Sequence, residues 1–123
     1  MKTVLVAEDR DSSRELLSIV LSAAGYRVVL AVDGEDALAR MKETPVDIVI
    51  LDIHMPRLDG FGVLRQLRAD PAYSRIPVIA LTASAMAGDR DSVIAAGFSE
   101  YISKPVNMSL LRREVARLLE NGQ

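Results

Sequence analysis

The amino-acid sequence predicts an α/β domain in which five parallel strands form an open, doubly wound sheet with five helices. Five short runs rich in Val, Ile and Leu alternate along the chain with segments of helical periodicity. Two of these runs are almost continuously apolar, which is typical of strands covered on both faces. Alternating strands and helices indicate a parallel sheet, and five such units are too few to close an eight-stranded barrel.

The predicted strands are the apolar runs themselves. They are Thr3–Ala7, Arg27–Ala31, Val46–Leu51, Pro77–Leu81 and Phe98–Ile102. The third and fourth are the nearly continuous ones. Ligands of open parallel sheets bind beyond the carboxyl ends of the strands, so the residues that follow each run are the candidates for a functional site.

The predicted helices lie between the strands, and each has a recognisable signal. Ser12–Glu15 reads as a capping box and Gly25 as the end of the first helix. Asp33 is expected to cap the second helix and Asn107 the last. The third helix stops before Pro71 and is preceded by a turn at Asp59-Gly60, and the fourth runs over about 86–96. The apolar stripes that support the first, third and last helices include Leu16, Leu17, Leu21, Val63, Leu64, Leu67, Leu110, Leu111 and Val115.

Length and composition exclude several classes of protein. A chain of 123 residues, half of them hydrophobic and 26% charged, is a single globular domain, 1–123. The absence of cysteine excludes disulfides and thiolate metal sites, and a single histidine argues against zinc or a Ser-His-Asp triad. The net charge of -2 gives no basic surface for nucleic acid. We therefore expect no nucleic-acid partner.

The sequence also lacks the signals of membrane proteins. No apolar run approaches the roughly 20 residues that span a bilayer, and 1–6 reads as a strand rather than a signal peptide. We expect a cytoplasmic protein without a membrane partner. Met1 stands where a natural start would, which favours a stand-alone protein over a piece of a longer one.

Polar residues follow four of the five predicted strands. Glu8-Asp9 follows the first strand, Asp52 the third, Thr82 ends the fourth, and Lys104 follows the fifth. Three carboxylates held close together need a compensating charge, which Mg²⁺ supplies through oxygen ligands and a lysine supplies as a compact cation. Such a site suits a phosphoryl group, and a carboxylate can itself be the nucleophile and form an acyl phosphate.

The sequence resembles the receiver domain of two-component response regulators over essentially its whole length. The resemblance, closest in kind to single-domain chemotaxis-type and cell-division-type regulators, rests on five motifs in order. They are Glu8-Asp9 after Val4–Ala7, Leu51–Pro56, Asp59-Gly60, Leu81–Ala83 and Tyr101–Pro105. No motif is specific alone, but together they are very specific. The resemblance implies a flavodoxin-like sheet with strand order 2-1-3-4-5.

The resemblance also implies a role for each acidic residue. Asp52 is the expected phosphoacceptor and a Mg²⁺ ligand. Asp9 is expected to bind Mg²⁺ directly, Glu8 mainly through water, and His54 through its backbone carbonyl, with its side chain in solvent. Many receivers have Asp-Asp where this chain has Glu8-Asp9, a variation that alters the outer shell of the metal more than the function.

Three further residues complete the expected site. Thr82 and Lys104 are expected to bind phosphoryl oxygens, and Lys104 to precede a cis bond to Pro105. Tyr101 is expected to change position together with Thr82 on activation, although a half-buried tyrosine on an outer strand needs no such role. His54 and Ser84, each two places after a site residue, are expected to influence hydrolysis of the acyl phosphate.

The implied partners are proteins. The resemblance implies a histidine kinase or histidine phosphotransfer protein as donor, which would dock near Ser12, Ser13 and Leu16 on the first helix. A downstream protein target would bind the face made by the fourth helix, fifth strand and fifth helix, which carries Met86 and the arginines of the last helix. Those arginines are Arg112, Arg113 and Arg117, and a merely solvated face explains them equally well.

Three other functions fit the sequence less well, and the expectation is a switch rather than an enzyme. Phosphatases with an aspartyl nucleophile need a second Asp two places on, where this chain has His54. A flavodoxin-like electron carrier needs a phosphate loop that Glu8-Asp9-Arg10-Asp11 would repel, and aromatic residues make up only 4% of the chain. A degenerate receiver that binds partners without phosphorylation remains open.

Overall fold

The computed structural model describes residues 1–83 and 89–121, in which five strands alternate with five helices. The strands are β1 (Thr3–Ala7), β2 (Arg27–Ala31), β3 (Ile48–Asp52), β4 (Val78–Thr82) and β5 (Glu100–Ser103). The helices are α1 (Asp11–Ala23), α2 (Gly34–Glu43), α3 (Gly60–Ala69), α4 (Asp89–Ala96) and α5 (Met108–Asn121). No helix in the described ranges is long and apolar enough to cross a membrane.

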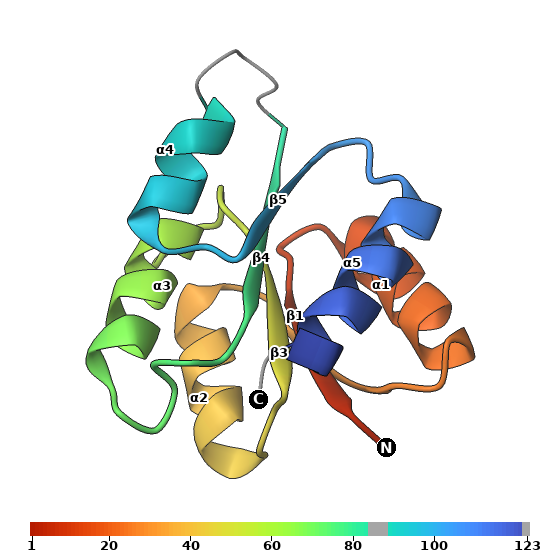
Figure 1. Cartoon of the computed structure of the whole chain (residues 1–123), viewed down its shortest axis with the longest axis horizontal. Coiled ribbons are helices and arrows are strands. Elements are labelled where there is room, and N and C mark those ends of the chain that lie inside the picture. The colour runs from red at the N-terminus through yellow and green to blue at the C-terminus, as the bar shows by residue number, and fades with distance from the viewer. Residues whose placement is uncertain (84–88, 122–123) are drawn as a thin grey trace.

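All five strands are parallel, and their order across the sheet is β2-β1-β3-β4-β5. The sheet is the middle of three layers: α1 and α5 cover one face, and α2, α3 and α4 cover the other (Figure 1). The predicted fold class and strand order are therefore confirmed. Since the strands are parallel, all five carboxyl ends reach the same edge of the sheet.

Each face of the sheet has its own hydrophobic core. Every residue of β1, β3 and β4 is buried, as the continuous apolar runs predict. Alternate strand residues face Leu17, Leu21, Leu111 and Val115 of α1 and α5 on one side. The others face the buried residues Ala37, Met41, Val63, Leu64, Leu67 and Val93 of α2, α3 and α4. These central strands give the site a rigid base.

The last three strands begin later than predicted. The third begins at Ile48 because Asp47, just before it, is hydrogen-bonded to Thr3 through both its side chain and its backbone. Its Oδ2 accepts a hydrogen bond of 2.8 Å from the N–H of Thr3, and its own N–H donates to the carbonyl of Thr3. β3 and β4 each extend one residue further than predicted and end on Asp52 and Thr82. Both site residues are therefore held within the sheet.

The start of the first helix differs from the prediction, because no capping box forms. α1 begins at Asp11, and the residue before it, Arg10, makes no side-chain cap. The Arg14 guanidinium instead binds the Asp11 carboxylate and the carbonyl of Glu8, and the Arg14 N–H donates to the carbonyl of Arg10. The helix therefore starts one residue before Ser12.

The other predicted helix ends are confirmed where the structure describes them. Asp33 Oδ1 accepts a hydrogen bond of 2.8 Å from Asp36 N–H, and Asn107 Oδ1 one of 3.0 Å from Leu110 N–H. Gly25 follows α1 with a positive φ of 96°. Asp59 caps α3 through the N–H of Gly62. Ser84 and Met86 lie outside the described residues.

The loop after β3 is pressed against the start of α2. Its residues 56–58 form a tight γ-turn: the Leu58 N–H donates to the Pro56 carbonyl at 2.8 Å, and Arg57 has a φ of 70°. Arg57 Nε lies 3.3 Å from Asp33 Oδ2. Gly34 packs so closely on this loop that a Cβ there would lie 2.0 Å from the Leu58 carbonyl oxygen. The contact fixes the loop that follows Asp52.

Candidate functional site

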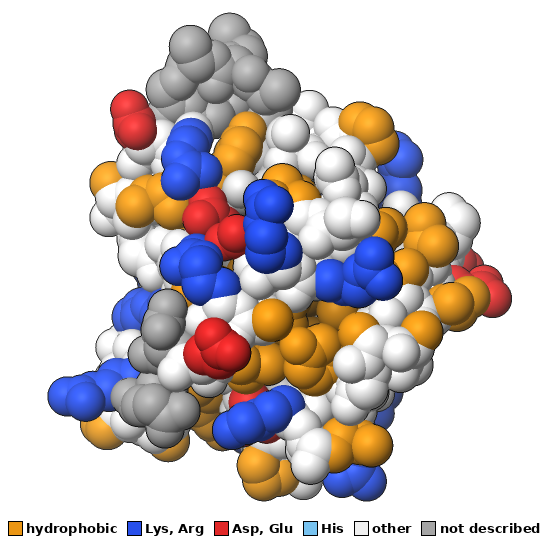
Figure 2. Space-filling model, turned by 45° about the vertical axis from the view of Figure 1, so that its right-hand side comes forward, with side chains coloured by type: hydrophobic (Ala, Val, Ile, Leu, Met, Phe, Trp, Pro, Cys, Tyr) orange, Lys and Arg blue, Asp and Glu red, His pale blue; other side chains and the backbone are white. Residues whose placement is uncertain are grey.

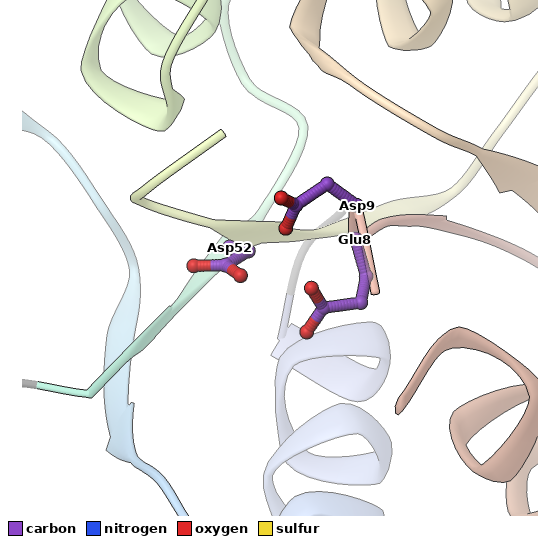
Figure 3. Close-up of side chains that lie close together, drawn as sticks. All are labelled: Glu8, Asp9 and Asp52. Atoms are coloured by element: carbon purple, nitrogen blue, oxygen red, sulfur yellow. The ribbon is translucent and has the colours of Figure 1, made fainter. Parts of the chain in front are cut away.

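Three carboxylates meet where two neighbouring central strands end. Glu8 and Asp9 follow β1, and Asp52 is the last residue of β3. Oxygen atoms of all three carboxylates lie within 4.8 Å of one another, and the side chains converge (Figure 3). Glu8 is completely buried and Asp52 is 4% exposed, whereas Asp9 is exposed.

Lys104 neutralises the two buried carboxylates. Its Nζ lies 2.7 Å from Glu8 Oε1 and 2.8 Å from Asp52 Oδ2. The backbone of Lys104 is also fixed, because its N–H donates to the carbonyl of Thr82 at 2.7 Å. The bond from Lys104 to Pro105 is cis, as the resemblance implies. The ammonium group is thus held in place by the ends of β4 and β5.

Backbone N–H groups bind the other oxygen of each buried carboxylate. Arg10 N–H donates to Glu8 Oε2 at 3.2 Å, and His54 N–H donates to Asp52 Oδ1 at 3.0 Å. Within the described part of the chain, no buried side-chain polar atom lacks a hydrogen-bond partner. Burial of both acids is therefore compensated by fixed hydrogen bonds, as buried charges require.

Burial shifts the pKa values of Glu8 and Lys104 in opposite directions, although the net shift of both is upward. Burial raises the pKa of Glu8 above its ordinary value, and the neighbouring Asp52 carboxylate adds to this, although the hydrogen bond from Lys104 lowers it. Burial lowers the pKa of Lys104, but its hydrogen bonds to Asp52 and Glu8 outweigh burial, and the net shift is upward. Lys104 consequently stays charged, and Glu8 is easier to protonate in the folded state than in the unfolded chain.

The carboxylates lie at the bottom of a cleft of about 620 Å³. The polar residues lining it are Glu8, Asp9, Arg10, Ser13, Asp52, His54 and Lys104. Its apolar residues are Leu16, Leu17, Ala83, Pro105, Val106 and Met108. Carboxylate and carbonyl oxygens are the ligands that Mg²⁺ prefers, and a neighbouring fixed cation suits a phosphoryl group. The donor set therefore fits a divalent cation beside a phosphoryl group.

The remaining predicted site residues lie around the cleft. His54 is exposed and lines it, as expected of a side chain in solvent. Thr82 is buried at the end of β4 and meets the site through its carbonyl bond to Lys104. Tyr101 is half-buried on β5 and packs against the core on the side of α3. Neither Thr82 nor Tyr101 lines the cleft among the residues that the structure describes.

Two features of the cleft escape sequence reasoning. Arg10 lines it, although its place beside two acids suggests a paired surface arginine. Val106 and Met108 line it from the segment after the cis proline, where neither a motif nor a periodic pattern marks them. For Arg10 the signal is its position directly after the acidic pair at the end of β1.

The raised pKa of Glu8 predicts a pH-dependent gain of stability in the variant Glu8→Gln. Because this pKa is higher in the folded than in the unfolded state, the stability that Glu8 contributes is present at low pH and lost as pH rises through the folded-state value. Without metal at neutral pH, Glu8→Gln should therefore unfold at higher urea than the wild type, followed by circular dichroism. The advantage should vanish in acid. A variant less stable at neutral pH contradicts the prediction.

Comparison with known proteins identifies the family. The response regulator receiver domain matches residues 4–116. A probable transcriptional regulator, ycf27, from Cyanophora paradoxa is 40% identical over 122 residues, which cover 99% of this chain and 50% of that protein. The chain thus spans about half the length of the first curated relatives that it matches, and only 25% of the response regulator PleD of Caulobacter vibrioides.

Solved structures agree over the whole fold. The receiver domain of the Francisella response regulator 1452 superimposes with a TM-score of 0.93 at 27% identity and full coverage of both chains. The receiver domain of the sensor histidine kinase PA1611 of Pseudomonas aeruginosa, solved with magnesium coordinated in its active-site cleft, has a TM-score of 0.88 at 34% identity, covering 97% of this chain and 98% of that one. Phosphorylation and Mg²⁺ binding at an acidic pocket are general features of such domains. The chain belongs to the response regulator receiver domains of two-component systems.

Proposed function

We propose that this domain is a phosphorylation-activated switch that accepts a phosphoryl group on Asp52 from a histidine kinase or histidine phosphotransfer protein. The observation that carries the proposal is the placement of Lys104, whose Nζ lies 2.8 Å from Asp52 Oδ2 inside a group of three carboxylates. Lys104 therefore places a fixed positive charge beside the Asp52 carboxylate, at the bottom of an open cleft. The new charge on Asp52 would then change the partner-binding surface.

We assign Mg²⁺ to Glu8, Asp9, Asp52 and the backbone carbonyl of His54. Asp9 is exposed, and its carboxylate makes no hydrogen bond with the residues that the structure describes, which favours direct binding. Both oxygens of Glu8 already accept hydrogen bonds, from Lys104 and from Arg10 N–H, which favours contact through water. The metal would supply neutralisation of charge on the phosphoryl oxygens.

The chain's own groups account for the transfer. One oxygen of the Asp52 carboxylate forms a bond to phosphorus as the bond from phosphorus to the donor's histidine nitrogen breaks, and the electron pair leaves with the imidazole. The hydrogen bond of 3.0 Å from His54 N–H orients the Asp52 carboxylate. Lys104 and the Thr82 hydroxyl would bind phosphoryl oxygens of the product. His54 and Ser84 would set the rate at which water removes the group.

The proposed output surface lies beyond Lys104, on α4, β5 and α5. Lys104 is joined to Thr82 through its backbone, and Tyr101 lies three residues before it on β5. Charge added to Asp52 pulls on Lys104 and Thr82 together, and Tyr101 would follow. Phosphorylation favours the active arrangement only to the extent that the phosphoryl group interacts more favourably with it than with the inactive arrangement.

Ion pairs tie the three elements of this output surface together. Glu100 on β5 pairs with Arg90 of α4 at 2.8 Å and with Arg117 of α5 at 3.3 Å. Arg117 also pairs with Glu114. Arg117 therefore has structural partners of its own. The side chain of Arg113 is 74% exposed, against 45% for Arg117, and it makes only a looser pair with Glu114 at 3.8 Å. Arg112 is exposed and donates only to Ser109 Oγ at 3.4 Å, so both are better placed to meet a downstream protein target. The side of α1 and α5 shows basic side chains spread among apolar ones (Figure 2).

The phosphodonor would approach over α1. Ser13 and Leu16 line the cleft beside the carboxylates, and Ser12 is exposed one residue earlier. Leu16 is 49% and Ile19 59% exposed, and they are two of the five large apolar side chains that are exposed in the described part of the chain. Exposed apolar side chains beside a reactive group indicate a protein-binding surface.

Intact mass spectrometry tests the proposal. Incubation with acetyl phosphate and Mg²⁺ should add one phosphoryl group to the wild type and to Asp70→Asn, an exposed control on the far side of the sheet. Asp52→Asn should remain unmodified, as should the wild type in EDTA. Modification of Asp52→Asn would contradict the assignment of the acceptor. A wild type that neither gains mass nor binds Mg²⁺ and beryllofluoride by NMR would indicate a degenerate receiver instead.

A further inference from the structure

Arg10 is a cation of the cleft whose guanidinium has no partner among the residues that the structure describes. It lines the cleft together with the three carboxylates, and it is exposed. Its backbone is engaged: the N–H donates to Glu8 Oε2, and the carbonyl accepts from Arg14 N–H. Its guanidinium makes none of the hydrogen bonds or ion pairs found between the residues that the structure describes. Arg10 is therefore a cation that none of the described side chains neutralises by direct contact.

The neighbouring acids are occupied by another arginine. Arg14 binds the carboxylate of Asp11 and, at 2.8 Å, the carbonyl of Glu8. Glu8 in turn is held by Lys104 and by a backbone N–H. Asp11 and Glu8 therefore cannot neutralise Arg10, and Asp9 is the residue assigned to the metal. The start of α1 thus carries one arginine with a structural role and one that is free to meet a ligand.

The charges of the cleft show what Arg10 adds. Three carboxylates and Lys104 leave two net negative charges, which a divalent cation cancels. Arg10 then gives the loaded cleft one net positive charge. The donor's phosphoryl group is an anion, and a charge of opposite sign at the mouth of a cleft speeds its entry. The first turn of α1, which lacks a side-chain cap, adds a partial positive charge on the same side.

We propose that Arg10 is a donor-steering residue, whose free guanidinium draws the anionic phosphoryl group of the donor toward Asp52. This inference rests on the proposed function. It predicts opposite effects of Arg10 on the two ligands of the cleft, because a positive charge attracts the phosphoryl anion and repels Mg²⁺. Substitution of the side chain leaves the backbone hydrogen bond to Glu8 in place, so the two effects can be measured in a folded protein.

The experiment compares Arg10→Lys, Arg10→Ala and Arg10→Glu with the wild type at low ionic strength. At saturating Mg²⁺, the apparent second-order rate constant with acetyl phosphate should fall by about threefold in Arg10→Ala and by about tenfold in Arg10→Glu. Arg10→Lys should keep most of the rate. Affinity for Mg²⁺, measured by calorimetry on unphosphorylated protein, should rise about two- to fivefold in Arg10→Ala and further in Arg10→Glu.

Salt and a matched control separate steering from a structural effect. Added salt should slow the wild type and should change Arg10→Ala less, because screening acts on the charge that the variant lacks. The same charge changes at Arg65, which is exposed on α3 across the sheet from α1, should alter neither quantity appreciably. Arg10→Glu that reacts as fast as the wild type, or Arg10 variants that lose Mg²⁺ affinity together with rate, would overturn the inference alone. A wild type that accepts no phosphoryl group would overturn the proposed function and this inference with it.

Discussion

Replacing Lys104 with methionine should lower the free energy of unfolding by about 2–4 kcal/mol at neutral pH without metal, because two buried carboxylates lose their shared cation. Glu8 is completely buried and Asp52 is 4% exposed, so water compensates only poorly for the lost ammonium. Methionine keeps much of the aliphatic length of lysine, which limits the packing loss. Urea unfolding followed by far-ultraviolet circular dichroism measures the difference.

The pH dependence identifies the cause of that loss. The hydrogen bond from Lys104 lowers the pKa of Glu8, so without Lys104 that pKa rises further in the folded state. The cost is therefore present at neutral pH and shrinks as acid protonates Glu8. Mg²⁺ should restore part of the stability, because it takes over the neutralising role. Lys42→Met, at an exposed position on α2, should change little. An equal loss for Lys104→Met in acid and at neutral pH would show that packing, not charge, was lost.

Gly34→Ala should destabilise the fold by at least about 3 kcal/mol, at the upper end of the cost of overpacking. The added Cβ would lie 2.0 Å from the carbonyl oxygen of Leu58 and 2.8 Å from a methyl group of Val63. Backbone atoms of the γ-turn cannot move aside as a side chain can. The loop after Asp52 must therefore shift, and Mg²⁺ affinity should fall along with stability, as calorimetry and urea unfolding would measure.

Gly25→Ala is the matched control for the loss of a glycine. Gly25 has a φ of 96°, but no atom lies within 4 Å of its missing Cβ. Its replacement should cost only about 1–2 kcal/mol of backbone strain and leave Mg²⁺ affinity unchanged. If Gly34→Ala costs no more than Gly25→Ala, the contact with Leu58 is not the reason for glycine at position 34.

Sequence periodicity predicted the parallel α/β sheet because strands and their crossover helices carry different and repeated apolar patterns. The strand order came from the family resemblance and not from periodicity. It also predicted which acids converge, since Glu8, Asp9 and Asp52 each follow an apolar run. The prediction failed where side chains compete for the same backbone groups. Ser12 was expected to cap α1, but the Arg14 guanidinium joins Asp11 to the Glu8 carbonyl, and the helix starts earlier.

Contacts between distant segments could not be predicted from the sequence, because local patterns do not show which segments meet in space. Arg68 reads as an ordinary residue at the end of α3, yet its guanidinium donates to the carbonyls of Ser74, Ile76 and Gly97. Nothing local marks an arginine that joins two loops. In the same way, the sequence could not show that Lys104 binds Glu8 as closely as Asp52, since that depends on the depth at which each side chain lies.

The ion pair between Lys104 and Glu8 joins residues that are 96 positions apart in the chain. Contacts of such long range form late in folding, because the loop between them must first be closed. A chain emerging from the ribosome has its acidic residues long before β5 brings in Lys104. Phosphate acceptance would then be confined to molecules that have finished folding, so that a half-made protein sends no signal.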